Sequence, residues 1–132
     1  MRRRGILALY VVATLAACET VPTAELAPVP VPGHPGVTYM PVQRMVGNIR
    51  LGFELQTFNG CWFGMTSEAY AQLQRHAPES NGRGPYQYRV AMMGRSTSPA
   101  ESESTAYGHL GMYPCQVQAT RFISIERVRF RL

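Results

Sequence analysis

Stretches in which apolar and polar residues alternate, interrupted by one helical stretch, most constrain how this chain can fold. Residues 49–55, 86–93 and 115–125 each have the two-residue period that is typical of a half-buried strand. Asn59-Gly60 follows the first of them, and this dipeptide favours a tight hairpin turn that leads into another short strand. The chain is therefore predicted to be mainly β.

One helix is predicted within this β pattern. Thr66 or Ser67 caps its start, and Pro78 ends it after about Ala77, because proline has no N–H to donate to a helical hydrogen bond. The apolar residues of this stretch recur at the spacing of one helical face. We therefore expect the helix to pack against the strands through that face.

The alternation also predicts which side chains of two strands face the core. In the first strand these are Ile49, Leu51, Phe53 and Leu55. In the last strand they are Val117, Ala119, Ile123 and Ile125. The pattern then slips by one residue, and such a slip turns every following side chain to the other face. A bulge or a new strand is therefore predicted near Glu126.

An open sheet of five or six short strands would leave two exposed edges. Closure into a small barrel removes those edges and leaves the helix to cover one end. We therefore predict a small closed β-barrel with one helix. The alternative is a small α+β domain, in which one helix packs on an antiparallel sheet.

The segment before the last strand resembles part of small OB-like bacterial envelope domains. Its sequence is Tyr107-Gly108-His109-Leu110-Gly111-Met112-Tyr113. The hairpin over residues 53–63 and the helix after it are similar to the first half of such domains, and the likeness covers about residues 45–127. The resemblance implies that residues 42–132 form an OB-like barrel and that the protein lies in the cell envelope.

The N-terminus resembles the signal peptide of bacterial lipoproteins. Three arginines precede an apolar stretch of about ten residues that is too short to span a bilayer, and this stretch ends in Leu15-Ala16-Ala17-Cys18. The resemblance to a lipobox implies that residues 1–17 are removed and that Cys18 carries diacylglycerol and a further acyl chain such as palmitate. Two or more acyl chains are what stable membrane anchoring requires.

Residues 18–41 are predicted to be a tether between the lipid and the barrel. Their prolines favour an extended polyproline II conformation of about 3.1 Å per residue, which allows a reach of up to about 70 Å. These prolines are Pro22, Pro28, Pro30, Pro32, Pro35 and Pro41. Glu19 is not the aspartate that retains many lipoproteins in the inner membrane, so the outer membrane, facing the periplasm, is the expected location in a Gram-negative host.

Two cysteines remain once Cys18 is assigned to the lipid. Cys61 and Cys115 form an even pair in a compartment that permits oxidation, so a disulfide is the favoured interpretation. The alternative is two buried thiols that never meet. A disulfide would close a loop of about 55 residues and contribute about 4 kcal/mol to stability.

Composition excludes several kinds of site. The chain contains no lysine and no aspartate, which excludes lysine nucleophiles, aspartate dyads, Ser-His-Asp triads and aspartate-rich calcium loops. Removal of the three N-terminal arginines lowers the formal charge from +5 to about +2, so nucleic-acid binding is not expected. The glutamates and histidines are scattered. We predict no catalytic residues, no metal and no cofactor.

Four residues are candidates for contact with a partner, namely Trp62, Tyr107, His109 and Tyr113. An exposed Trp62 would be a good anchor for a sugar or protein, but packing in the core is its alternative. The alternative for His109 is a turn residue that bonds locally.

The expected function is that of a lipid-anchored envelope protein with a small binding or structural domain. Its partner, an envelope protein or a glycan, and its oligomeric state stay open. A different hypothesis is an inhibitor of a wall-degrading enzyme such as lysozyme, with a loop over residues 96–113 entering the active-site cleft. An envelope hydrolase is a third hypothesis, which two glutamates at catalytic separation in a cleft would support.

Overall fold

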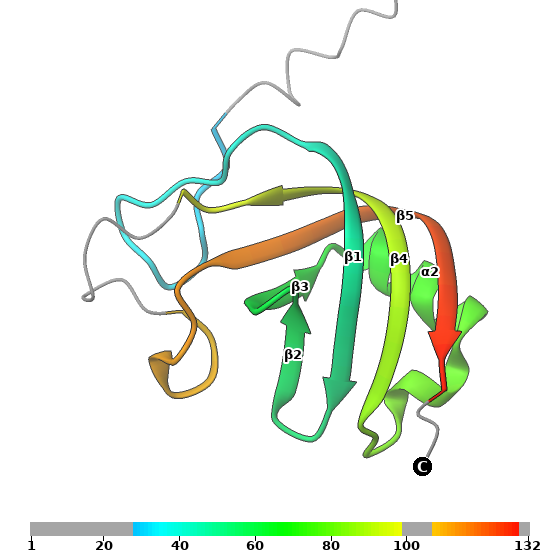
Figure 1. Cartoon of the computed structure of the whole chain (residues 1–132). Coiled ribbons are helices and arrows are strands. Elements are labelled where there is room, and N and C mark those ends of the chain that lie inside the picture. The colour runs from blue at the N-terminus through cyan, green and yellow to red at the C-terminus, as the bar shows by residue number, and fades with distance from the viewer. Residues whose placement is uncertain (1–27, 99–106, 130–132) are drawn as a thin grey trace, which may run out of the picture.

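Five strands form a closed barrel in the computed structural model, which describes residues 28–98 and 107–129 (Figure 1). The strands are β1 (Gln43–Gly52), β2 (Leu55–Phe58), β3 (Cys61–Met65), β4 (Tyr86–Ser96) and β5 (Gln116–Val128). Their order around the barrel is β1-β2-β3-β5-β4, and β4 pairs with β1 to close it. The pairing of β3 with β5 is parallel and the other pairings are antiparallel. The prediction of a small closed OB-like barrel is confirmed, and the open-sheet alternative is wrong.

Helix α2 (Ser67–His76) lies between β3 and β4 in sequence and packs against β5. Thr66 caps it, because its side-chain Oγ1 accepts a hydrogen bond of 3.3 Å from the Ala69 N–H. The same hydroxyl donates to the carbonyl of Thr120 on β5, at 3.2 Å. Ala69 and Leu73 face the barrel and are fully buried. The predicted helix and its cap are confirmed.

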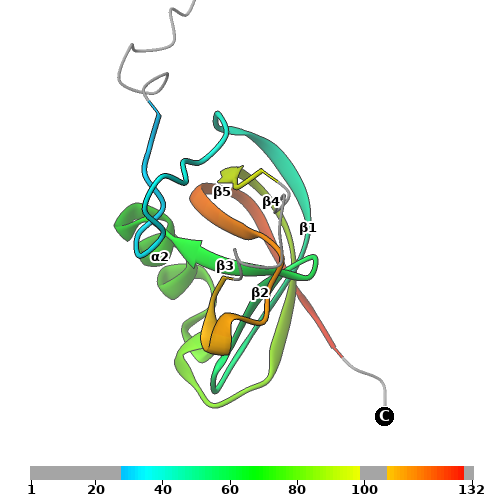
Figure 2. The same ribbon diagram turned by 90° about the vertical axis from the view of Figure 1, so that its left-hand side faces the viewer.

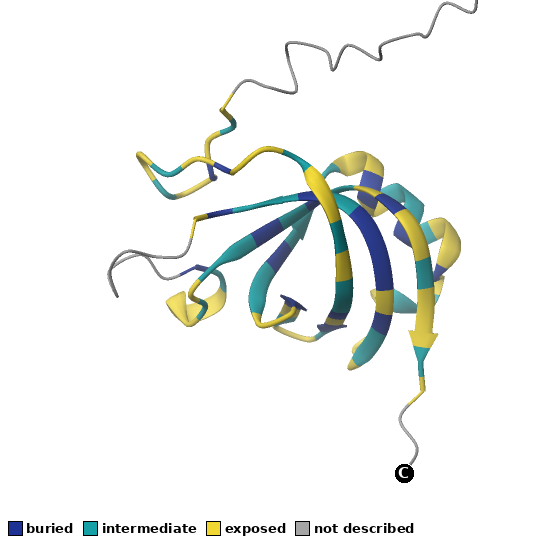
Figure 3. Cartoon of the chain, turned by 45° about the horizontal axis from the view of Figure 1, so that its top comes forward, coloured by how far each residue is buried: buried dark blue, intermediate teal, exposed yellow. Residues whose placement is uncertain are grey.

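The core lies inside the barrel and receives buried residues from all five strands and from α2. Figure 3 shows the buried positions, in dark blue, between half-buried and exposed ones along the strands. The largest members of the core include Ile49, Phe63, Leu73, Tyr88 and Met92. Tyr88 places its hydroxyl at the edge of this core and donates a hydrogen bond of 3.0 Å to Glu79. Burial and this bond to a carboxylate raise the pKa of Tyr88 to about 12. The pKa of Glu79 is lowered, first by a hydrogen bond with its own backbone and then by the Tyr88 hydroxyl.

The stretch predicted as the first strand, residues 49–55, is divided by a turn that the alternation of apolar and polar residues does not indicate. β1 ends at Gly52 and β2 begins at Leu55, so Phe53 and Glu54 form the connection. Phe53 is 77% exposed, and the prediction that it faces the core is therefore wrong. The turn consists of two residues, so the apolar residues keep the same two-residue spacing on both sides of it. The alternation in the sequence therefore does not reveal the turn. The predicted hairpin turn at residues 59–60 is confirmed, and both residues have positive φ.

The last strand is one continuous strand with two irregularities in its pairing with β4. The register shifts between Ala91 and Met92 and again between Met93 and Gly94, opposite residues 119–124 of β5. Each extra residue rotates the following side chains to the other face, so Phe122 is buried and Ile123 is exposed. The prediction that Ile123 faces the core is wrong. A bulge or a new strand was predicted near Glu126; the irregularities occur, but earlier in the strand, opposite residues 119–124, and no new strand begins.

Residues 29–40 pack against the barrel. The Tyr39 N–H donates to the Val29 carbonyl at 2.9 Å, and the Met40 N–H donates to the Ser96 carbonyl at 2.8 Å. Val31 and Tyr39 are buried. The prediction of an extended tether up to residue 41 is therefore wrong for residues 29–40, because the apolar side chains of this segment pack against the barrel. Residues 1–27, including Cys18 and the predicted signal peptide, lie outside the described residues.

Candidate binding surface

A disulfide joins Cys61, at the start of β3, to Cys115, just before β5, with a Cα–Cα distance of 4.8 Å. The favoured pairing of these two cysteines is confirmed. Beside it, the Trp62 N–H donates a hydrogen bond of 2.9 Å to the Cys115 carbonyl. The chain that leads into β5 is therefore held to β3 both covalently and through its backbone.

Three of the four candidate contact residues form a small second core outside the barrel. The Trp62 and Tyr113 rings are 5.3 Å apart between centroids, and Tyr107 is only 2% exposed. Val31 and Tyr39 from the N-terminal segment are buried in the same cluster. Trp62 is thus neither in the barrel core nor fully exposed. These aromatic residues stabilise the loop over residues 107–113, and Tyr107 is too buried to contact a partner.

The loop over residues 107–113 is held in one shape. The backbones of Tyr107 and Tyr113 exchange two hydrogen bonds, of 2.8 and 3.1 Å. Gly108 has a φ of +73°, and a Cβ there would lie 2.3 Å from the Trp62 ring, so only glycine fits. Leu110 also has positive φ, which is strained for a branched residue. It projects outward and is 79% exposed.

The β1–β2 turn lies beside the 107–113 loop. In Figures 1 and 2 the β1–β2 turn and the 107–113 loop lie at the same end of the barrel. His109 Nε2 lies 3.7 Å from Glu54 Oε2, so the two loops touch through an ion pair when the histidine is protonated. Phe53 precedes Glu54 in the β1–β2 turn, and Leu110 and Met112 belong to the same loop as His109; their side chains are 77%, 79% and 72% exposed. We call these five residues the loop surface.

Of the five residues of the loop surface, only His109 was predicted from the sequence to contact a partner. Phe53 was assigned to the core, and Leu110 and Met112 were not singled out. The exposure of Leu110 and Met112 could have been predicted, because apolar residues beside a glycine in a turn-rich segment do not usually face a barrel core. For Phe53 the continuous alternation concealed the turn.

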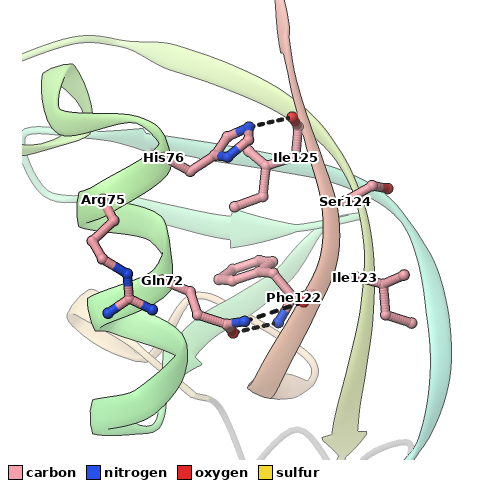
Figure 4. A pocket seen from close by; sticks show the side chains of 7 residues that line it. All are labelled: Gln72, Arg75, His76, Phe122, Ile123, Ser124 and Ile125. Atoms are coloured by element: carbon pink, nitrogen blue, oxygen red, sulfur yellow. Dashed lines mark hydrogen bonds between the residues drawn. The ribbon is translucent and has the colours of Figure 1, made fainter.

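Cavities also lie elsewhere among the described residues, and two of them adjoin helix α2. The larger, of about 290 Å³, lies between α2 and β5 (Figure 4). Gln72 bonds both the N–H and the carbonyl of Phe122, at 2.8 and 3.4 Å, and His76 Nε2 lies 3.1 Å from the Ile125 carbonyl. These side chains cover a strand edge, so they explain this cavity as a helix–strand junction. The smaller, of about 230 Å³, lies between β1, β2 and α2.

Within residues 28–98 and 107–129, no three side chains of His, Cys, Asp or Glu are grouped so that they could hold a metal ion. The ring of His34 lies against Tyr107, and His76 and His109 have the contacts given above. In the same part of the chain, no helix has both the length and the apolar character needed to cross a membrane.

Comparisons of this chain with protein-family models, with curated proteins and with solved structures found no match. The fold is established by the structure itself, and the function is argued from the surfaces described above.

Proposed function

We propose that this protein is a lipid-anchored envelope protein whose barrel binds a partner protein through the loop surface. The observation that carries the proposal is that Leu110, Phe53 and Met112 are the three most exposed large apolar side chains of the described residues, and that they belong to the two loops that the His109–Glu54 contact joins. OB-type barrels bind their ligands on strands 2 and 3 and on the loops between strands 1 and 2 and strands 4 and 5. The loop surface occupies those two loops.

The chemistry of the loop surface favours a protein over a nucleic acid. Residues 53–65 and 97–115 contain no arginine or lysine, and their one histidine, His109, lies 3.7 Å from the Glu54 carboxylate, so these segments present little positive charge to a phosphate backbone. Leucine, methionine and phenylalanine side chains instead gain free energy by burial against another apolar surface. The disulfide and Gly108 already hold the loop in place, so little conformational entropy is lost on binding.

The N-terminal segment sets how far the barrel can lie from the lipid. Residues 29–40 pack against the barrel, so the span between Cys18 and the folded part is about ten residues. Ten residues reach at most roughly 35 Å. The proposed anchor therefore keeps the barrel within about one domain diameter of the membrane, where an envelope partner is accessible.

Lipid attachment is tested by comparing the unchanged full-length protein with Cys18→Ser in envelope fractions. We expect the unchanged protein to require detergent for release and its N-terminal peptide to carry the mass of the acyl chains. Cys18→Ser should lose both properties, because the oxygen of serine does not replace the thioether. An unmodified Cys18, or release of the unchanged protein without detergent, contradicts the anchor.

Partner binding is tested with a photoreactive residue placed at position 110 in the intact envelope. We expect a discrete cross-linked protein, which is absent when the same residue is placed at exposed Ser67 on α2. Phe53→Ala should weaken binding of the identified partner at least tenfold, as expected for a central apolar contact. Identification of a wall-degrading enzyme would favour the inhibitor hypothesis. Equal cross-linking from both positions contradicts the proposal.

A further inference from the structure

The lining of the smaller cavity contains no side chain that is charged at neutral pH. It opens between the end of β1, helix α2 and the 3₁₀ turn Pro78–Asn81. Its lining residues are Leu51, Gly52, Gln56, Met65, Tyr70, Leu73, Gln74, Ser80, Asn81 and Gly82. Glutamate, arginine and histidine are missing from this set. A neutral ligand is therefore favoured over a phosphate, a carboxylate or a cation.

The inner part of this cavity is apolar and its outer part is polar. Leu51 and Leu73 are buried, and Met65 is partly buried and packs against the core. The ring of Tyr70 is 47% exposed and provides a flat wall. A ligand that has both an apolar face and polar edges would be matched by this arrangement.

The polar groups are already connected to one another. The Tyr70 hydroxyl donates to Asn81 Oδ1 at 3.1 Å, the Asn81 amide donates to Gln74 Oε1, and Gln74 Nε2 donates to Ser80 Oγ at 3.3 Å. Each side-chain amide has two N–H donors, so Asn81 and Gln74 each keep one for a ligand. Gln56 adds an exposed amide on β2. The cavity thus offers oriented donors and acceptors in fixed positions.

We propose that this cavity binds one uncharged sugar unit, with an N-acetylated amino sugar preferred. Sugar hydroxyls both donate and accept, as side-chain amides and hydroxyls do, and the C–H face of a pyranose ring can lie on the Tyr70 ring. The acetamido group adds an amide for the Gln74 and Asn81 amides and a methyl group for the apolar inner part. A cavity of about 230 Å³ is smaller than a drug-sized site and suits a single ring.

This sugar site is separate from the loop surface. Gly52 lines the cavity, whereas the adjoining Phe53 and Glu54 belong to the loop surface, so the two sites share no residue. A sugar in the cavity would leave Leu110 and Met112 free. The sugar proposal therefore does not depend on the protein partner, and each can fail alone.

The test is a titration of the isotope-labelled full chain with N-acetylglucosamine, followed by NMR of the side-chain amide signals. We expect saturable shifts for Gln74 and Asn81 with a dissociation constant on the order of 1 mM, as a ligand of this size allows. Glucose should bind more weakly, and glucose 6-phosphate should bind least, because the cavity has no cation for the phosphate.

Substitutions at two positions, Tyr70 and Gln56, separate the sugar contacts from general damage to the fold. Tyr70→Ala should weaken binding at least tenfold, whereas Tyr70→Phe, which keeps the ring, should weaken it only a few-fold. Gln56→Ala changes an exposed side chain and should also weaken binding without affecting folding. Leu110→Ala is the matched control and should leave the affinity unchanged. The proposal is overturned by shifts that do not saturate, by equal binding of glucose 6-phosphate, or by unchanged affinity in Gln56→Ala and Tyr70→Ala.

Discussion

Removal of the Cys61–Cys115 disulfide should lower the free energy of unfolding by about 4 kcal/mol. The bond joins residues 54 positions apart, and closing a loop of that length restricts the unfolded chain by about this amount. Domains of this size have total stabilities on the order of 5–15 kcal/mol, so the loss is a large share of the total. Urea unfolding of Cys61→Ala/Cys115→Ala beside the unchanged protein measures it.

Reducing agent supplies the control for the disulfide. It should lower the urea midpoint of the unchanged protein to that of the double variant, and it should leave the midpoint of the double variant unchanged. A double variant as stable as the unchanged protein would show that the loop adds no constraint on the unfolded state. The loop surface should also lose its order on reduction, since the Cys61–Cys115 bond holds the 107–113 loop to β3.

Phe63→Ala should mainly lower stability and Phe53→Ala should mainly weaken partner binding, although both replace a phenylalanine. Phe63 is fully buried in the barrel, and its truncation leaves a cavity that should lower the free energy of unfolding by about 3–5 kcal/mol. Phe53 is 77% exposed, so its truncation should change the free energy of unfolding by less than about 0.5 kcal/mol.

Denaturant unfolding of the two phenylalanine variants, each folded well enough to give a cooperative transition, checks this contrast. Near-ultraviolet circular dichroism reports whether the barrel of Phe63→Ala keeps its packing. Partner binding should follow the reverse order, with the larger loss in Phe53→Ala at equal amounts of folded protein. Equal destabilisation by the two substitutions would show that Phe53 packs in the core, as the strand alternation alone indicates.

Much of the fold could be predicted from local patterns. The hairpin at residues 59–60, the cap at Thr66 and the strand over residues 86–93 were predicted correctly, since each depends on a few neighbouring residues. Closure of the barrel followed from the need to remove sheet edges. Pairing of the two cysteines followed from their even number.

The errors share one physical cause. The turn at Phe53 and the phase change before Ile123 alter which face a side chain occupies, and both depend on pairing with strands far away in the sequence. The packing of residues 29–40 likewise depends on Tyr107 and Trp62, which lie far along the chain. Alternation of apolar and polar residues indicates that a segment is extended, but it does not indicate which distant segments pair with it.

Local patterns were sufficient to predict the helix and its cap, the hairpin turn at residues 59–60 and most of the strands, because these depend on backbone preferences over a few residues. The pairing of distant strands established that Phe53 is exposed in a turn that contacts the loop of Leu110 and Met112, and that Tyr70, Gln74 and Asn81 line one cavity. Binding sites of this kind are made by segments that meet through barrel closure and long-range hydrogen bonds. Their composition is therefore a property of the folded chain, which a local pattern does not contain.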